Sequence, residues 1–416
     1  MRSTRGRNSE DLPLLAVVYG TRSFGVFDLA EAARGTCRLA FVVDGDPSLG
    51  RLLGRLGPVI DITGLDDGDA ARTTLQLAPD GITTFMDRHL ARTAFLAAEL
   101  SLPFHSPETA QNLIHKHEQR SALRRAGLPG PNWVLVPPDP DVQPDLGGLQ
   151  FPVVVKPDTG AGSRQTTLAG NEQEVLAFIT RARSAGIASV VVEEFLPGVP
   201  ELMAPNFASF VSVESVIGAG QLRHLAVTGK FPLAYPFRET GHFIPSHLPQ
   251  PVVSKVLEVV TAAISGVGIT VGAVHSEVKL TPRGPRIIEV NGRVAGAIPE
   301  VLSRASGFSL LQSTMSAALG GAPAGTDLVP CERIGYRINV QPPTWARRVR
   351  SIDGIDALRS LPGVTSVGVL RNDGDPVDWR LGTDELVLVV IGSVASLDAL
   401  EEVRFEIDKA VTVDYE

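Results

Sequence analysis

The stretch that decides the fold is residues 275–293, HSEVKLTPRGPRIIEVNGR. Residues 274–280 and 286–291 have the composition of β-strands, and the five residues between them, TPRGP, predict a turn. Two strands joined by so short a turn form an antiparallel hairpin. If Leu280 pairs with Arg286 next to the turn, the register of the whole hairpin follows.

In this register two carboxylates face each other across the hairpin. Glu277 lies directly opposite Glu289. His275 lies opposite Asn291. Opposed Cβ atoms are ~4.5–5.5 Å apart and like charges repel there, so we expect a cation between the two acids. The oxygen ligands of Glu277, Glu289 and Asn291 fit Mg²⁺ rather than zinc. Arg293, just beyond the strand, is placed to hold a phosphoryl or carboxylate oxygen. A slip of one residue would leave only two solvated acids on a surface hairpin.

A glycine-rich turn lies upstream of the hairpin. Residues 151–165 read FPVVVKPDTGAGSRQ, a valine-rich strand that ends at Lys156 and is followed by the turn. Gly160 and Gly162 allow backbone N–H groups to approach a polyphosphate, with Ser163 in the same turn and Lys156 as a point charge. The lysine precedes the glycines, so this is not the common P-loop pattern. An ordinary surface turn beside an exposed lysine is the alternative.

Two further stretches contain groups suited to a nucleotide and a small substrate. Residues 190–198, VVVEEFLPG, form a strand that ends in acids, an aromatic and a turn, whose backbone can face a base edge. Residues 238–246, RETGHFIPS, place Glu239 and His242 where they could converge on a small ligand. His242 is a candidate general base, because an unperturbed histidine titrates near pH ~6.5. Taken alone, both stretches are better explained as ordinary loop and strand-end residues.

The N-terminal part has the pattern of a parallel α/β sheet. Leu14–Tyr19 and residues 39–43 read as buried strands on either side of a helix at 26–34. The turn at 20–25 lacks the G-x-G-x-x-G pattern, so no NAD site is predicted. Ser-Pro-Glu at the start, and glycine and prolines after the end, predict one helix from 106 to 126.

Composition excludes several classes of protein. The 416 residues include 38 Lys and Arg against 46 Asp and Glu, a net charge of −8 that argues against nucleic-acid or anionic-membrane binding. Two cysteines, Cys37 and Cys331, exclude a disulfide framework and fit a reducing compartment. Residues 1–13 are polar and predict a disordered tail without a signal or membrane segment, so a cytoplasmic location is expected.

In their order along the chain, these features resemble the ATP-grasp superfamily. The order is Lys116 on a helix, Lys156 before the glycine-rich turn, then E-E-F-L-P-G, then E…E-V-N-G-R. The resemblance covers about residues 106–325, with the strand–helix part before it matching a pre-ATP-grasp domain. The E-T-G-H-F-I-P segment and the part after Gly335 look most like the L-amino acid ligase branch, which makes dipeptides.

The resemblance implies a role for each of these residues. Lys116 and Lys156 would contact the ATP phosphates, and the turn at 160–163 would close over them. The adenine pocket would be lined by Glu193, Glu194, Phe195 and Leu196, and the ribose would be held by Glu201, which here lies one residue further on than in many relatives. Mg²⁺, with Mn²⁺ as a candidate substitute, would be held by Glu277, Glu289 and Asn291. The acyl-transfer side would contain Arg293 beside the acyl phosphate or substrate carboxylate, Glu239 and His242 on the amino-acid side, and Lys230 near the γ-phosphate.

The expected architecture is α/β, an ATP-grasp fold with a Rossmann-like pre-ATP-grasp domain. We predict a tail (1–13), the N-terminal domain (14–105), the ATP-grasp domain (106–330, with subdomains 106–195 and 196–330) and a C-terminal α+β module (331–416). Residues 151–291 read as short strands and glycine-rich turns, and the residues from Gly335 on as a separate strand-rich module.

The activity implied is an ADP-forming carboxylate–amine ligase. It would activate an amino-acid carboxylate as an acyl phosphate and join it to an amine, as a dipeptide or a γ-glutamyl-type amide. Its partners would be small carboxylates and amines, with no nucleic acid and no membrane, and a homodimer is the candidate assembly. The alternatives are another ATP-grasp acyl-phosphate enzyme, such as a purine-pathway ligase, and a nucleotide-binding regulator without turnover.

Overall fold

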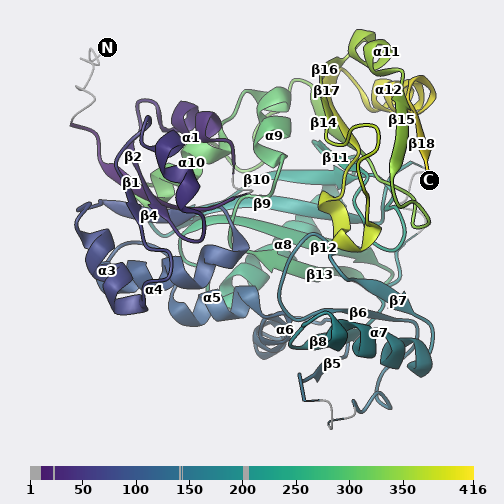
Figure 1. Ribbon diagram of the computed structural model, residues 1–416, viewed down its shortest axis with the longest axis horizontal. Coiled ribbons are helices and arrows are strands. Elements are labelled where there is room, and N and C mark those ends of the chain that lie inside the picture. The colour runs from purple at the N-terminus through teal and green to yellow at the C-terminus, as the bar shows by residue number, and fades with distance from the viewer. Residues whose placement is uncertain (1–10, 22–23, 140–141, 143, 200–205) are drawn as a thin grey trace.

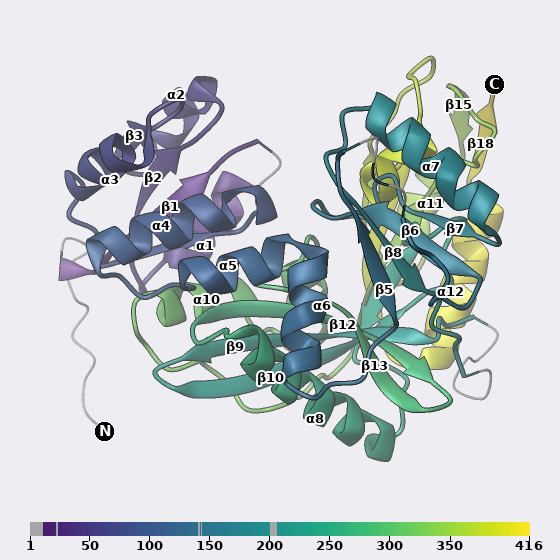
Figure 2. The ribbon, with the colours of Figure 1, turned by 90° about the horizontal axis from the view of Figure 1, so that it is seen from below.

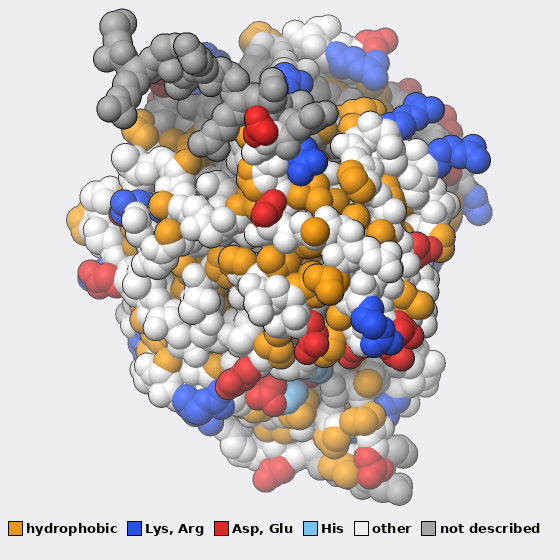
Figure 3. All heavy atoms as spheres, turned by 90° about the vertical axis from the view of Figure 1, so that its left-hand side faces the viewer, with side chains coloured by type: hydrophobic (Ala, Val, Ile, Leu, Met, Phe, Trp, Pro, Cys, Tyr) orange, Lys and Arg blue, Asp and Glu red, His pale blue; other side chains and the backbone are white. Residues whose placement is uncertain are grey.

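The computed structural model describes residues 11–21, 24–139, 142, 144–199 and 206–416. Most of the predicted tail therefore lies outside the described residues. The N-terminal elements, in purple, lie on the left of Figure 1, and the C-terminal elements, in yellow, lie on the right. Seen from the left, the surface has charged side chains of both signs scattered among polar and hydrophobic ones (Figure 3).

The N-terminal sheet has four parallel strands in the order β3-β2-β1-β4. Its strands are β1 (Leu14–Tyr19), β2 (Arg38–Val43), β3 (Val59–Asp61) and β4 (Gly81–Thr84). The helices of this region are α1 (Val26–Ala33), α2 (Gly50–Leu53), α3 (Asp67–Leu75) and α4 (Leu90–Leu100). Every residue of β1 is buried, as expected for a parallel strand with helices on both faces of the sheet. The two predicted strands and the helix between them are confirmed.

The single helix predicted at 106–126 is wrong, because the structure has two helices there. They are α5 (Pro107–Ile114) and α6 (Lys116–Arg125). Ser106 caps α5 as the sequence predicts, accepting a hydrogen bond from the Thr109 amide at 3.1 Å. His115 between the helices has an extended backbone with φ −97° and ψ 116°, so α6 starts in a new direction.

A second sheet is antiparallel and has the order β5-β8-β6-β7. Its strands are β5 (Trp133–Val136), β6 (Val153–Pro157), β7 (Thr167–Ala169) and β8 (Val190–Glu194). Helix α7 (Glu172–Ser184) packs its apolar side, including Val175 and Ile179, on this sheet. In Figure 2 this layer lies on the right and the N-terminal sheet lies on the left.

The largest sheet has eight strands in the order β13-β12-β9-β10-β11-β14-β17-β16. Five of its strands are β9 (Phe210–Gly218), β10 (Gln221–Lys230), β11 (Gly241–Ile244), β12 (Gly272–Thr281) and β13 (Gly284–Asn291). The helices packed around it are α8 (Gln250–Val267), α9 (Ile298–Ser306) and α10 (Leu310–Ala318). Helix α10 contacts β9 and also α1, so the N-terminal sheet and this sheet share one hydrophobic core.

The interpretation of residues 151–291 as strands and turns missed two long helices, α7 and α8. Asn171 caps α7 and pairs with Glu174 three residues later, a start signal that the sequence does contain. Helix α8 is the one described helix that is long and apolar enough to cross a membrane. Its buried residues, such as Val253, Val256 and Val260, repeat at helical spacing and pack on the large sheet.

The hairpin of β12 and β13 has the predicted register at the acids and a different one at the turn. Glu277 is opposite Glu289, as predicted. Next to the turn, however, Leu280 pairs with Pro285 and not with Arg286, so the loop is shorter than expected. An irregularity after Glu277 absorbs this difference, because a β-bulge places one extra residue on one strand.

The C-terminal residues continue the large sheet. Strands β14 (Ile334–Val340), β16 (Val364–Val369) and β17 (Leu388–Val394) belong to it, and β15 (Val349–Asp353) pairs with β18 (Thr412–Tyr415). Helices α11 (Ile355–Ser360) and α12 (Leu397–Ala410) accompany them. Because β14 is hydrogen-bonded to β11, this region is not separate from the central sheet, contrary to the expectation of an independent module. The domain boundaries remain a prediction.

Candidate active site

One cavity of about 2160 Å³ is lined by residues of the N-terminal region, of the β5-β8-β6-β7 sheet and of the eight-stranded sheet. Every predicted site residue within the described part of the chain lines it: Lys116, Lys156, Gly160, Gly162, Ser163, Glu193, Glu194, Phe195, Leu196, Lys230, Glu239, His242, Glu277, Glu289, Asn291 and Arg293. Glu201, the predicted ribose ligand, lies outside the described residues. Residues that are far apart in the sequence therefore meet around a single space.

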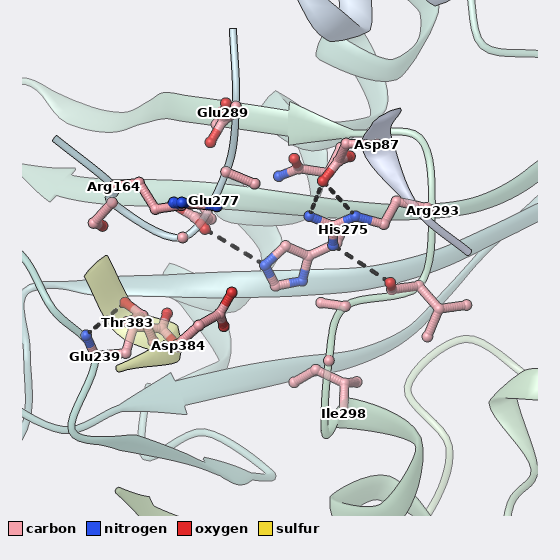
Figure 4. Close-up of a pocket in the computed structure, with 18 of the residues that line it drawn as sticks. Asp87, Arg164, Glu239, His275, Glu277, Glu289, Arg293, Ile298, Thr383 and Asp384 are labelled. Carbon is pink, nitrogen blue, oxygen red and sulfur yellow. Dashed lines mark hydrogen bonds and ion pairs between the residues drawn. The ribbon is translucent and has the colours of Figure 1, made fainter. Parts of the chain in front are cut away.

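The opposed acids of the hairpin face this cavity (Figure 4). Glu277 has a His275 ring nitrogen at 3.6 Å, and Glu289 has the Lys116 ammonium at 3.3 Å. Burial would raise the pKa of Glu277, but His275 and nearby lysines outweigh it and lower the pKa to about 2. Glu277 therefore stays charged although it lies directly opposite Glu289.

His275 is held between two carboxylates. Its Nδ1 lies 2.9 Å from Glu214, which is buried beneath the cavity, and its other nitrogen faces Glu277. Burial would lower the pKa of His275, but Glu214 raises it to about 9. A histidinium beside Glu277 fixes the orientation of that carboxylate.

The donor set of the hairpin fits a magnesium ion. Glu277, Glu289 and Asn291 offer hard oxygen atoms from two adjacent strands. The Asn291 side chain makes no hydrogen bond to any described residue, although the residue is only 7% exposed. An unpartnered amide beside two opposed carboxylates is what an ion bound there would satisfy.

The lysines on the other side of the cavity are held by ion pairs. Lys156 contacts Glu193, and Arg120 donates to the same carboxylate at 2.9 Å. Burial would raise the pKa of Glu193, but the two cations lower it to about 2. Lys116 donates to the Gly160 carbonyl oxygen at 2.7 Å, in addition to facing Glu289.

The break between α5 and α6 positions Lys116. Asp158, two residues after Lys156, accepts a hydrogen bond from the His117 amide at 3.0 Å, and its carbonyl accepts one from the Lys116 amide at 2.9 Å. The carboxylate also contacts the side chains of His115 and His117. The first turn of α6 is thereby tied to the end of β6, and Lys116 and Lys156 face the same space.

The glycine-rich turn rests on the C-terminal region. Thr383 donates its amide to the Gly162 carbonyl oxygen at 2.7 Å, and Ser163 donates to the Phe237 carbonyl oxygen at 2.9 Å. Gly382 has φ +84°, and a Cβ there would lie 2.1 Å from the Gly162 oxygen. The turn is therefore packed against the short 3₁₀ segment Trp379–Asp384, which the sequence did not indicate.

The segment E-E-F-L contributes to the cavity in two ways. Glu193 points into the ion-pair cluster, whereas Glu194 accepts hydrogen bonds from Asn132 and the Gln150 amide on the outer side. The Phe195 ring lies 5.7 Å from the Lys279 ammonium and 6.4 Å from the Phe237 ring. An aromatic wall of this kind suits a planar base.

Lys230, Glu239 and His242 come together on β10, β11 and the loop between them. The Lys230 ammonium donates to Glu239 at 2.6 Å. Burial would lower the pKa of Lys230, but Glu239 and other acids raise it. Burial holds the pKa of His242 well below 6.5, and Lys230 and Arg337 lower it further. His242 is therefore neutral in the folded protein, and its role as a general base stays a prediction.

Arg293 is fixed by a residue of the N-terminal domain. Asp87 accepts from Nε and Nη2 of Arg293 at 2.9 and 2.6 Å (Figure 4). Asp87 follows β4 at the carboxyl end of a parallel sheet, a place where binding residues collect. Its place just after a parallel strand is the sequence feature that could have identified Asp87 as a site residue.

Other residues around the cavity carried no signal. They include Arg120, Lys279, Arg337, Asn339, Thr383 and Asp384. Lys279 lies within the hairpin stretch but has no role in its pattern of acids, and the others come from segments without a motif. Only the fold brings them together. A single sequence does not reveal them, because cavity shape is a tertiary property.

The family comparison agrees with this geometry. A family model for the ATP-grasp domain matches residues 149–300. The L-amino acid ligase from Bacillus licheniformis has a solved structure that superposes with a TM-score of 0.79 at 20% identity, covering 98% of this chain and 99% of that one. The predicted ATP-grasp fold is thus confirmed.

Two curated relatives are ligases. The alanine–anticapsin ligase of Bacillus subtilis (strain 168) is 27% identical over 52% of this chain and 49% of its own length. The L-arginine-specific L-amino acid ligase of Bacillus subtilis is 24% identical over 74% of this chain and 73% of its own length. The chain spans about half to two thirds of the length of four curated relatives that it matches.

Proposed function

From the ATP-grasp domain that this chain carries, we propose that the protein is an ATP-dependent ligase that joins an amino-acid carboxylate to an amine, with release of ADP and phosphate. The observation that carries the proposal is the pair of opposed acids, Glu277 and Glu289, in one cavity with Lys116 and Lys156. Two carboxylates and two lysines around a glycine-rich turn suit a polyphosphate and its metal ion.

In the first step, an oxygen of the carboxylate substrate attacks the γ-phosphorus of ATP. The bond from that phosphorus to the bridging oxygen breaks, and ADP leaves. Lys156 and Lys116 hold the phosphates, and the glycine-rich turn excludes water from the acyl phosphate. Glu277, Glu289 and Asn291 would hold Mg²⁺, which neutralises phosphate charge when bound.

In the second step, the amine nitrogen attacks the acyl carbon. The bond from that carbon to the phosphate oxygen breaks, phosphate leaves and the nitrogen loses a proton. Arg293, held by Asp87, is placed to steady the oxygens of the acyl phosphate. Alignment and charge neutralisation supply the catalysis, and no covalent bond to the protein is required.

The names of the similar proteins support amino acids as the substrate class. The relatives include an alanine–anticapsin ligase and an L-arginine-specific L-amino acid ligase. The cavity is also large enough for a nucleotide together with two small substrates, since single small-molecule sites are commonly ~300–1,000 Å³.

The test measures ADP release with ATP and Mg²⁺ over a panel of amino acids, singly and in pairs, with mass spectrometry of the products. A product whose mass equals both amino acids minus water supports the proposal and identifies the pair. ADP without a condensed product would indicate a different acyl acceptor. If ATP binds but no amino acid gives ADP, the amino-acid class is wrong.

A further inference from the structure

Two charged side chains from the C-terminal region line the cavity without an ion-pair partner among the described residues. They are Arg337 on β14 and Asp384 at the end of the 379–384 segment. Arg337 donates only one hydrogen bond, from Nε to Asn339 at 2.7 Å, and its two terminal nitrogens are unpartnered within the described part of the chain. By contrast, many other cations that line the cavity contact a carboxylate, among them Lys116, Lys156, Lys230 and Arg293.

Arg337 lies far from the hairpin acids. It is opposite His242 on β11, and His242 is opposite Lys230 on β10. β14 is four strands away from β12, which is about 19 Å at the usual strand spacing of ~4.8 Å. An unpartnered guanidinium at this distance from the predicted metal site suits the carboxylate of a second molecule, which it can bind with two parallel hydrogen bonds.

Asp384 lines the same end of the cavity as Arg337, beside the glycine-rich turn, and it is among the acids that counteract the lowering of the Arg337 pKa by burial. A Cβ added at Gly162 would be 3.8 Å from the Asp384 carboxylate. The preceding residue, Thr383, bonds to Gly162 and accepts a hydrogen bond from the Glu239 amide at 3.2 Å. Figure 4 shows the Asp384 side chain turned into the cavity. A carboxylate next to a phosphate-binding turn is unfavourable unless a cation lies beside it.

From these positions we propose that Asp384 and Arg337 form the subsite of the amine substrate, and that this substrate is an amino acid. Asp384 holds its amino group near the acyl phosphate, and Arg337 holds its carboxylate. The proposal rests on the ligase function proposed above. The two side chains have opposite charges, and Asp384 acts on Arg337 electrostatically. Within the described residues they nevertheless form no ion pair with each other, as expected when a molecule with both charges fits between them.

The test combines substrate kinetics with binding. We compare wild type with Arg337→Gln, Arg337→Lys and Asp384→Asn. Arg333→Gln and Asp373→Asn are matched controls, because both residues are exposed in the same region and do not line the cavity. We expect Arg337→Gln to raise the KM of the amine substrate about 10- to 100-fold, with the KM of ATP and of the carboxylate substrate within about twofold. Arg337→Lys should recover part of the loss, and Asp384→Asn should also raise the KM of the amine substrate.

A carboxamide version of the amine substrate identifies the group that Arg337 holds. Wild type should use it about as poorly as Arg337→Gln uses the free amino acid, and the variant should not distinguish the two. A change in the KM of the carboxylate substrate instead, or equal use of both amine forms by wild type, would overturn the proposal.

Calorimetry with single amino acids separates this proposal from the ligase function. Binding that is present in wild type and lost in Arg337→Gln supports the subsite even if no pair gives turnover, in which case only the ligase function fails. Undiminished binding of the amine substrate by Arg337→Gln and Asp384→Asn would overturn the subsite while leaving the ligase function intact.

Discussion

The two ends of the cavity differ in how their charges are held. At the hairpin end, Lys116 faces Glu289, and Lys156 contacts Glu193. At the C-terminal end, Arg337 and Asp384 have no ion-pair partner among the described residues. Paired charges are already oriented before a ligand arrives, whereas unpaired ones depend on the ligand for compensation. The comparison suggests that the hairpin end performs chemistry common to many substrates, whereas the C-terminal end selects one particular substrate.

The largest expected effect is at the hairpin end. Glu289→Gln removes a predicted metal ligand and the partner of Lys116, so ADP formation should fall about 1,000-fold or more, with and without the amine. ADP release and its dependence on Mg²⁺ concentration measure this.

Glu258→Gln on the exposed side of α8 is the control and should behave as wild type. If Glu289→Gln keeps near-normal turnover, the metal assignment at this end is wrong.

The next largest effect is expected where the 379–384 segment of the C-terminal region contacts the glycine-rich turn. Gly382→Ala places a Cβ against the Gly162 carbonyl oxygen, so the glycine-rich turn must move. We expect kcat to fall about 10- to 100-fold and more ADP to form per amide, because water reaches the acyl phosphate. The ratio of ADP to amide measures this coupling.

Gly374→Ala has a similar backbone angle, φ +86°, but no atom within 4 Å of the added Cβ. It reproduces the backbone strain without the clash. An equal loss of coupling in both variants would show that the contact with the turn is not the cause.

A smaller effect is expected where the N-terminal domain meets the cavity. Asp87→Asn keeps an acceptor for Arg293 but removes the charge, so kcat/KM for the carboxylate substrate should fall about 10-fold. Arg293→Lys should lower kcat/KM for the carboxylate substrate further, because one ammonium group cannot replace a guanidinium that donates through two nitrogens. Unchanged kinetics in Asp87→Asn would mean that the ion pair does not position Arg293.

The smallest effect is on stability, at His242 between the two ends. The folded protein holds the pKa of His242 well below 6.5, mainly by burial, so only the unfolded chain gains a proton as the pH falls through 6.5. This contribution to the free energy of unfolding is complete above that pH and decreases by about 1 kcal/mol between about pH 7.5 and 5.5. Urea unfolding of wild type and His242→Asn should show the decrease in wild type only. Parallel pH profiles would contradict a buried neutral histidine.

The hairpin shows what the sequence could predict. Its two strands are adjacent in the chain, so a period of two residues placed Glu277 opposite Glu289 correctly. The predicted pairing next to the turn was wrong by one residue, and the bulge after Glu277 restores the predicted pairing of the two acids. The pairing of the two acids could be predicted from the alternation of side chains along each strand. The length of the turn could not, because it is set by local geometry that composition does not specify.

The opposite case is the part of the site that comes from distant segments. The break at His115 depends on hydrogen bonds to Asp158, more than forty residues away. Arg337 and Asp384 reach the cavity only because β14 joins the sheet beside β11. Their sequence neighbourhoods resemble any other strand or loop, so single-sequence reasoning had no pattern to detect.

The pairing of β14 with β11 also bears on how the chain folds during synthesis. β11 ends at Ile244, and its partner β14 starts at Ile334, so about ninety residues must emerge from the ribosome before that edge is covered. Until then β11 presents unpaired backbone groups, which are sites for aggregation or chaperone binding. The cavity is complete only after the C-terminal strands of the large sheet have been synthesised. An incomplete chain therefore has no finished site in which ATP could be hydrolysed without a product.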